Sequence, residues 1–139
     1  MKKLLLFTCL FFTALFVRAQ SGSWVIKLNN KTILSTRLED AQKNSRKIKA
    51  ADWKKPGKLE IIFREDDKNT WIRSFLLVDA SDNEILRKDS TIHASINLAD
   101  LRKLFAGKKQ LIIYTTIAPL DPNIAIRIRR VHLCTLQLP

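Results

Sequence analysis

The sequence predicts an all-β protein, a two-sheet antiparallel β-sandwich with one or two short helical crossovers. Apolar and polar residues alternate in several short segments, which is the pattern of strands that bury one face. Residues that favour turns separate these segments, and helical spacing is sparse. Apolar sheet faces must be covered, and two antiparallel sheets packed face to face cover each other.

Residues 1–19 predict a cleavable signal peptide. Lys2 and Lys3 precede an almost wholly apolar stretch, and Ala19 supplies the small residue that a signal peptidase site requires. A retained membrane anchor is the alternative, but the apolar stretch is shorter than the roughly 20 residues that span a bilayer. We therefore expect residues 20–139 to be a single exported domain, periplasmic or extracellular, that is not an integral membrane protein after cleavage.

The two cysteines have different expected fates. Cys9 would leave with the signal peptide; the alternative, a lipid anchor at this residue, is favoured by Leu6 but poorly matched by Thr8. Cys134 would then be the only cysteine, so no intramolecular disulfide could form, and we expect it to be buried as a small apolar residue. A reactive thiol or an intermolecular bridge is the alternative for Cys134.

The alternation and the turn residues locate the expected strands. Asn29 and Asn30 predict a tight hairpin, while 65–69, 81–83 and 119–122 predict longer turns. Several short strands at this spacing indicate a sandwich of immunoglobulin-like or related type. The expected strand segments are 23–28, 32–34, 58–64, 71–72, 75–78, 85–86, 91–96, 111–117 and 124–138.

The last of these strands is expected to be unusually long. Alternate isoleucines from Ile124 to Ile128 are expected to face the core, with Arg127 and Arg129 facing solvent. The parity of the apolar positions changes just after these arginines. This change predicts a β-bulge near Arg130, or a bend by which the strand serves both sheets.

Helical structure is expected mainly at 97–107, where Asn97 could cap the first turn and Gly107 could end the helix. A capping box beginning at Thr36 could start another helix, but the polar residues 43–47 equally indicate a loop. The amino-acid sequences of segments 48–59 and 96–111 are also similar to each other.

Both similar segments run from Ile through Ala-Asp, a large apolar residue and two basic residues to Gly-Lys and a strand. We interpret each as a short helical crossover between strands, which carries the chain from one sheet to the other. The match is short, so coincidence is the alternative.

Motifs that would indicate catalysis are absent from the sequence. It contains no Gly-x-Ser-x-Gly and no phosphate-binding glycine loop, and it has 3 glycines in total. The acids near 65–67 and 79–84 lack the spacing of a calcium loop. We therefore predict no catalytic residue and no cofactor, although two carboxylates that meet only in space would escape such a search.

A metal site is the weak alternative use of three residues that could supply nitrogen and sulfur ligands. His132 and Cys134 stand two positions apart, which predicts that they share one face of an expected strand. His93 stands on another strand, so zinc or copper could be ligated. The axial methionine and ligand loop of a blue copper site are missing, so we predict packed or edge histidines and no metal. Trp24, Trp53 and Trp71 are likewise expected to pack rather than to stack on sugars.

Positive charge is the most informative remaining feature. Loss of residues 1–19 would remove three basic residues and no acid, so 25 basic residues become 22 against 13 acids, and the formal charge changes from +12 to +9. Basic surfaces attract anionic partners. Groups of lysine and arginine residues flank the two similar segments, and three arginines lie on the last strand. The candidate anion-binding residues are Lys54, Lys55, Lys58, Arg102, Lys103, Lys108, Lys109, Arg127, Arg129 and Arg130.

These observations favour an exported, non-catalytic binding or structural module of the cell envelope. The expected partner is an anionic glycan, a lipid headgroup or an acidic protein, and no specific nucleic acid is predicted. General solubility is the alternative role of the charge. A small secreted enzyme, or an inhibitor or accessory subunit that pairs through its last strand, are the alternative functions.

Overall fold

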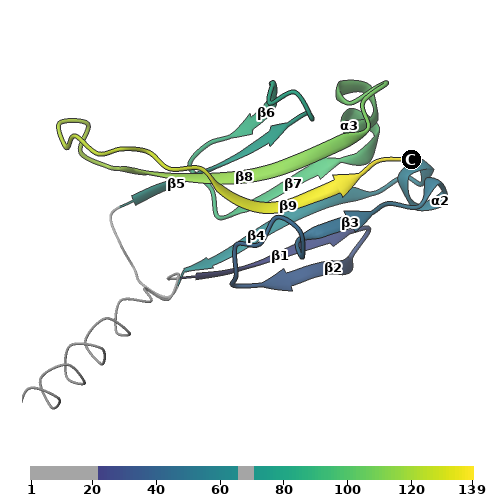
Figure 1. The fold of residues 1–139 in the computed structure, drawn as a ribbon, viewed down its shortest axis with the longest axis horizontal. Coiled ribbons are helices and arrows are strands. Elements are labelled where there is room, and N and C mark those ends of the chain that lie inside the picture. Colours follow the sequence, from purple (N-terminus) through teal and green to yellow (C-terminus); the bar gives the residue numbers. More distant parts are fainter. Residues whose placement is uncertain (1–21, 66–70) are drawn as a thin grey trace, which may run out of the picture.

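Two β-sheets and two short helices form the fold in the computed structural model, which describes residues 22–65 and 71–139 (Figure 1). The predicted signal peptide lies outside the described residues. The first sheet has the order β2-β1-β4-β7, with β1 Gly22–Leu28, β2 Lys31–Thr36, β4 Lys58–Glu65 and β7 His93–Asn97. The second has the order β3-β9-β8-β5-β6, with β3 Ser45–Lys47, β5 Trp71–Val78, β6 Glu84–Lys88, β8 Gln110–Pro119 and β9 Val131–Gln137.

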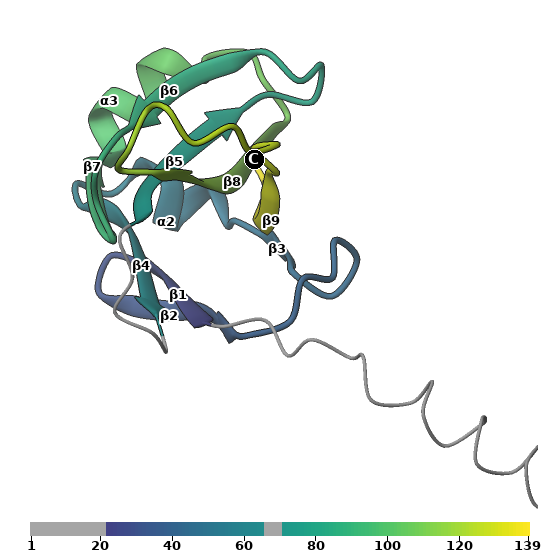
Figure 2. The ribbon, with the colours of Figure 1, turned by 90° about the vertical axis from the view of Figure 1, so that its left-hand side faces the viewer.

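One hydrophobic core joins the two sheets, which Figure 2 shows as two layers. Trp24 is buried between the layers, and its indole nitrogen donates a hydrogen bond of 3.0 Å to the carbonyl oxygen of Leu133 in the opposite sheet. The first sheet contributes Trp24, Ile26, Leu28, Leu34, Leu59, Ile61, Phe63, Ala94 and Ile96 to the core; the second contributes Phe75, Leu77, Leu111, Ile113, Leu133, Cys134 and Leu136.

The mostly β, two-sheet, sandwich-like architecture therefore agrees with the sequence prediction, with one departure in strand direction. β3 pairs with β9 in parallel, whereas the other pairs are antiparallel. The strand order also differs from the ABED and CFG sheets of an immunoglobulin constant domain. The immunoglobulin-like type consequently stays a prediction.

The two similar sequence segments do form helical crossovers between the sheets. α2 (Ala50–Lys54) joins β3 of the second sheet to β4 of the first, and α3 (Leu98–Leu104) joins β7 of the first to β8 of the second. Gly107 has φ +74°, in the left-handed region expected after a helix, but Asn97 caps α3 without a side-chain hydrogen bond.

Turns form where the asparagines predict them, but residues 36–50 differ from both expectations. Asn29 and Asn30 have positive φ angles of 51° and 67° in the tight β1–β2 hairpin. The polar segment of 43–47 ends in β3, which Arg46 fastens by donating to the carbonyl of Ile33 at 2.8 Å. Pairing with β9 thus makes a strand from residues that have no apolar alternation.

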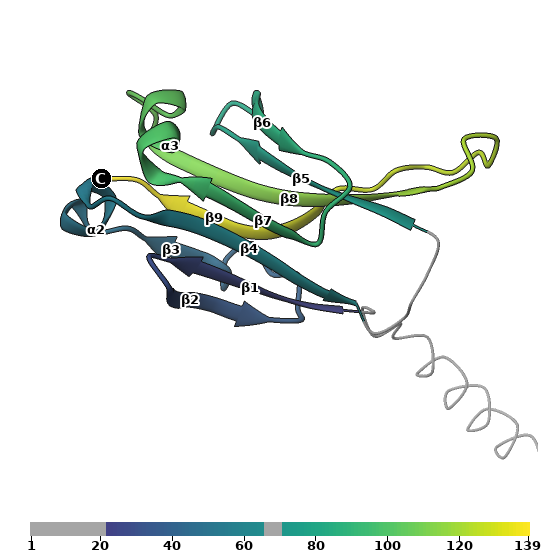
Figure 3. The same cartoon turned by 180° about the vertical axis from the view of Figure 1, so that it is seen from behind.

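The prediction for the last strand is wrong over its first half. β9 begins at Val131, and the three isoleucines expected in the core are 39–56% exposed. Residues 120–130, here called the arm, extend beyond the two sheets (Figures 1 and 3), so no opposing apolar face lies there to cover them. Ile92, which the alternation in 91–96 places on the same face as buried Ala94 and Ile96, lies just before β7 and is exposed.

The bulge in the last strand is present, but at a different place from the predicted one. The register shifts where Cys134 pairs with Ile113 and His132 pairs with Tyr114, which leaves Leu133 as the additional residue. His132 therefore shares the outer face with Tyr114, while Cys134 lies in the core. The prediction that His132 and Cys134 share a face is wrong because of this bulge.

Candidate anion-binding surface

The two helical crossovers lie side by side at one end of the fold. Arg102 of α3 reaches α2 and donates from Nη1 to the carbonyl oxygens of Trp53 at 2.6 Å and Lys55 at 3.2 Å. The amide of Leu98, which begins α3, donates to the carbonyl of Gly57 at 2.9 Å. These bonds hold together residues 41 to 49 positions apart in the sequence. We call this region the helical end (Figure 3).

The β1–β2 hairpin completes the helical end. The Asn29 side chain accepts a hydrogen bond from the Lys58 amide at 3.2 Å and donates to the carbonyl of Asp52 at 3.4 Å. The Asn29 amide in turn donates to the Lys58 carbonyl at 3.0 Å. Gly57 is needed for this approach, because a Cβ atom there would lie 1.7 Å from Asn29 Oδ1.

The fold gathers the basic residues of both crossovers at this end. They lie on α2 and α3, in the short segments that follow them, or at the first residue of β4. The residues brought together are Lys54, Lys55, Lys58, Arg102, Lys103, Lys108 and Lys109. Juxtaposed helices therefore turn two separate runs of charge in the sequence into one surface, which the sequence alone did not establish.

Ion pairs occupy some of these cations and leave others unpaired. Lys108 binds Asp79 at 2.8 Å, and Lys58 lies 3.4 Å from Glu60. Among residues 22–65 and 71–139, no ion pair involves Lys54, Lys103 or Lys109, and all three side chains are exposed. This part of the surface consequently carries uncompensated positive charge.

A pocket of about 240 Å³ lies beside α2. Leu28 and Ile48 are buried and form part of its apolar lining, and its charged lining includes Lys55 and Asp52, which form an ion pair of 3.3 Å. The described lining is Leu28, Asn29, Lys31, Ile33, Ile48, Lys49, Asp52 and Lys55. Such a pocket offers cationic contacts around an apolar base and suits a small anionic group with carbon attached.

Sequence reasoning missed Lys31 and Lys49, the other two lysines of this pocket. Lys31 follows the predicted Asn29-Asn30 turn, and Lys49 immediately precedes α2. In the sequence, both lysines stand beside elements that the local pattern predicts. What no local pattern could show is that the hairpin packs against the first crossover, which places both lysines at one pocket.

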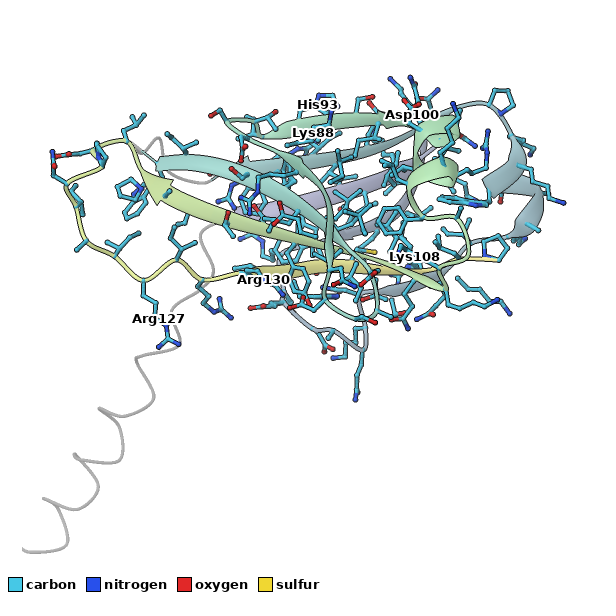
Figure 4. All side chains as sticks on the ribbon, turned by 90° about the horizontal axis from the view of Figure 1, so that it is seen from above. Lys88, His93, Asp100, Lys108, Arg127 and Arg130 are labelled. Carbon is cyan, nitrogen blue, oxygen red and sulfur yellow. The ribbon has the colours of Figure 1, made fainter. Side chains whose placement is uncertain are left out.

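The predicted arginines of the last strand lie apart from this surface. Figure 4 shows Arg127 on the arm and Lys108 at the opposite end. Arg129 binds Glu39 at 2.5 Å, while Arg130 binds Asp82 and stacks over the Tyr114 ring at 4.4 Å. The ten candidate residues are thus divided between the helical end and the arm.

The three weak metal candidates are not brought together. His93 is on an exposed edge of β7, where its Nε2 lies 3.2 Å from Glu60 Oε1, while His132 and Cys134 belong to the other sheet. His132 Nε2 is 2.8 Å from Thr135 Oγ1. Across residues 22–65 and 71–139, no cluster of three or more histidine, cysteine or acidic residues is suited to a metal ion.

Burial explains the chemistry of the remaining titratable groups in β9. It raises the pKa of the Cys134 thiol to about 12, and the side chain is buried without a disulfide, as predicted for an apolar role. Burial lowers the pKa of His132, against the opposing charge of Glu39. Trp24 is also buried, so it offers no platform for a sugar.

Comparison with protein-family models, curated proteins and solved structures gives no match for this chain. No helix in the described part of the chain is long and apolar enough to span a membrane. Assignment of a function therefore depends on the arrangement of the chain's own residues.

Proposed function

We propose that this chain is an exported, non-catalytic binding module of the cell envelope, which holds an anionic group at the helical end. The observation that carries the proposal is the packing of α2 against α3 and the β1–β2 hairpin, which places Lys31, Lys49 and Lys55 around one pocket. Export rests on the signal-peptide pattern of residues 1–19.

The ligand chemistry follows from the side chains of the pocket. Lysine ammonium groups bind phosphate, sulfate or carboxylate as point charges, and the apolar base fits the carbon skeleton that carries such a group. A charged glycan and a lipid headgroup share this anionic chemistry.

The binding test uses the exported form of the protein and two probes. Calorimetric titration with heparin, an anionic glycan without lipid, and with vesicles containing phosphatidylglycerol separates the glycan source from the lipid source, since these vesicles lack the sugar. Binding to the preferred probe should weaken as salt rises from 0.1 to 1 M, because the Debye length falls from about 10 Å to about 3 Å.

The decisive variant is K31Q/K49Q/K55Q, which removes the three lysines of the pocket. Exposed ion pairs are worth up to about 1 kcal/mol each, so the triple change should lower affinity by about tenfold or more. K43Q/R64Q/K88Q removes the same charge elsewhere and is the matched control. Equal losses in the two variants would assign the charge to solubility and would refute a site at the helical end.

Arg102 should be left unchanged in these variants. Its guanidinium donates to two carbonyl oxygens of the first crossover, so neutralising it would loosen the packing of α2 on α3. A binding defect in such a variant would not separate lost charge from lost structure.

A further inference from the structure

The arm has the sequence of a strand, but it pairs with no strand in the described part of the chain. After the turn in which Asp121 accepts from the Asn123 amide at 2.9 Å, residues 125–130 run without helix or strand assignment. Among the described residues, the backbone of 125–130 takes part in no backbone hydrogen bond. A segment with alternating β-branched residues favours a pleated strand, so its local preference is unsatisfied in the isolated chain.

Aliphatic side chains dominate the exposed surface of the arm. Leu120, Ile124, Ile126 and Ile128 are 60%, 51%, 39% and 56% exposed. Such concentrated exposure at one protrusion differs from the scattered apolar residues of an ordinary surface. The three isoleucines stand at alternate positions, so in a strand they would share one face.

The arm carries three arginines and one acid, and two of the arginines are fixed at its base. Arg129 and Arg130 are held by Glu39 and Asp82 of the body, while no ion pair of Arg127 exists within residues 22–65 and 71–139. The single acid of the arm, Asp121, accepts hydrogen bonds from Asn123 in the turn. A partner would therefore meet aliphatic side chains, an unpaired arginine and free backbone groups.

We propose that the arm adds as a β-strand to an exposed sheet edge of a partner protein whose edge strand carries acidic and aliphatic side chains. Free amides and carbonyls of 125–130 would supply the ladder, the isoleucines the apolar contact, and Arg127 the charge complementarity. β8 is also open beside the arm's base, since its pairing with β9 ends at Thr115 while its strand continues to Pro119.

Two other occupants fit these observations less well. A bilayer would have to accept an extended backbone whose polar groups lack partners, which costs several kcal/mol per group in hydrocarbon. A second copy would bring two strongly basic chains together, so like charges would repel where Arg127 needs an acidic neighbour.

The test measures amide hydrogen exchange by NMR in the exported form of the protein. The probe is the capped peptide Thr-Glu-Val-Glu-Val-Glu-Val-Thr, and its saturating addition should slow exchange by tenfold or more at the alternate amides of 125–130 that face the peptide. A peptide of the same sequence, N-methylated at alternate residues along the bonding edge, keeps the side chains but loses its donors. A second control peptide carries Lys in place of Glu. Both controls should bind at least tenfold more weakly.

Variants then separate strand pairing from adhesion of the isoleucines. Ile126→Pro removes an amide and should abolish peptide binding with unchanged thermal stability, since the arm makes no ladder in the free protein. Ile126→Val keeps both strand preference and apolar character, so it should bind like the parent. K31Q/K49Q/K55Q should bind the peptide normally, which makes failure here distinguishable from failure of the site at the helical end.

Four outcomes would overturn the proposal. They are absence of protection at 125–130, equal binding of the N-methylated peptide, and protection of the arm in concentrated protein without peptide, which would indicate self-association. The fourth is stronger protection by vesicles containing phosphatidylglycerol than by the peptide, which would identify the arm as a lipid-binding element.

Discussion

Asp79 shows how a single side chain connects distant parts of the chain at the helical end. Its carboxylate binds Lys108 at 2.8 Å and accepts hydrogen bonds from the amides of Ser81 and Asn83 at 3.0 and 2.9 Å. The bond to Lys108 and those to Asn83 hold the pKa of Asp79 far below its ordinary value. Its ionised form therefore stabilises both the β5–β6 turn and the start of β8.

Asp79→Asn should change how stability depends on pH. The native pKa of Asp79 lies below its unfolded value of about 3.9. The stabilisation by Asp79 is therefore fully present above the unfolded pKa and is lost as pH falls through the native pKa. The variant should melt at a lower temperature than the parent at pH 6, and this difference should shrink towards pH 2.5. Circular dichroism would measure both melting temperatures over this pH range. A difference between variant and parent that stays constant with pH would contradict stabilisation by ionised Asp79.

Residues of the same charge have unlike roles in this surface. Arg102 is committed to carbonyl oxygens of the first crossover, whereas Lys54 and Lys103, close to it in space or sequence, are exposed. Composition and spacing in the sequence do not distinguish the roles of these three cations. Only hydrogen-bond geometry separates a structural cation from one that is available to a ligand.

At the scale of elements, the helical crossovers determine where charge collects. Each is too short to be stable alone, and each is held by tertiary contacts: Leu98 and Leu101 of α3 are buried, and Gly57 lets the chain after α2 meet the hairpin. The close contact of Gly57 with Asn29 thus links the position of α2 to that of the β1–β2 turn.

Gly57→Ala should destabilise the protein through this contact. The added methyl group would collide with Asn29 Oδ1, and forced packing of this kind costs about 1–3 kcal/mol. In an Asn29→Gly background the same change should cost less, because the obstructing side chain is gone. Equal costs in both backgrounds, measured by urea denaturation, would show that the contact is not the cause.

Gly107→Ala is the matched comparison for that measurement. No atom lies within 4 Å of a Cβ built at Gly107, so only its φ of +74° opposes the substitution. We expect a cost of roughly 1–2 kcal/mol that does not depend on residue 29.

At the scale of the whole molecule, two surfaces of different chemistry lie at opposite ends (Figures 3 and 4). The helical end combines lysines with a pocket, whereas the arm combines isoleucines with arginine and an unpaired backbone. The core between them contains no residue of the arm. Binding at one end can therefore be altered without disturbing the other.

Replacing residues 122–128 by a short Gly-Ser linker tests this independence. Every side chain removed is exposed, so the change in the free energy of unfolding should stay near the roughly 0.5 kcal/mol typical of surface substitutions. That corresponds to a melting temperature within about 4 °C of the parent. Binding of the anionic probe at the helical end should persist. Loss of cooperative unfolding would show instead that the arm supports the core.

The sequence by itself determined the local features: alternating strands, the Asn29-Asn30 hairpin, the two crossovers and the burial of Cys134. These follow from the period of apolar residues and from backbone preferences, which act over a few neighbours. Export through residues 1–19 stays a prediction, since those residues lie outside the described structure.

Only the tertiary structure decided which charges meet and which strand residues find a partner. Lys31 and Lys49 join the pocket because the hairpin packs on α2, and β3 forms on polar residues because β9 offers an edge. The alternation of Ile124, Ile126 and Ile128 predicts a core strand, yet these residues are exposed and project past the sheets. Alternation specifies that one face should be buried, but the presence of a covering surface depends on long-range packing that no local pattern contains.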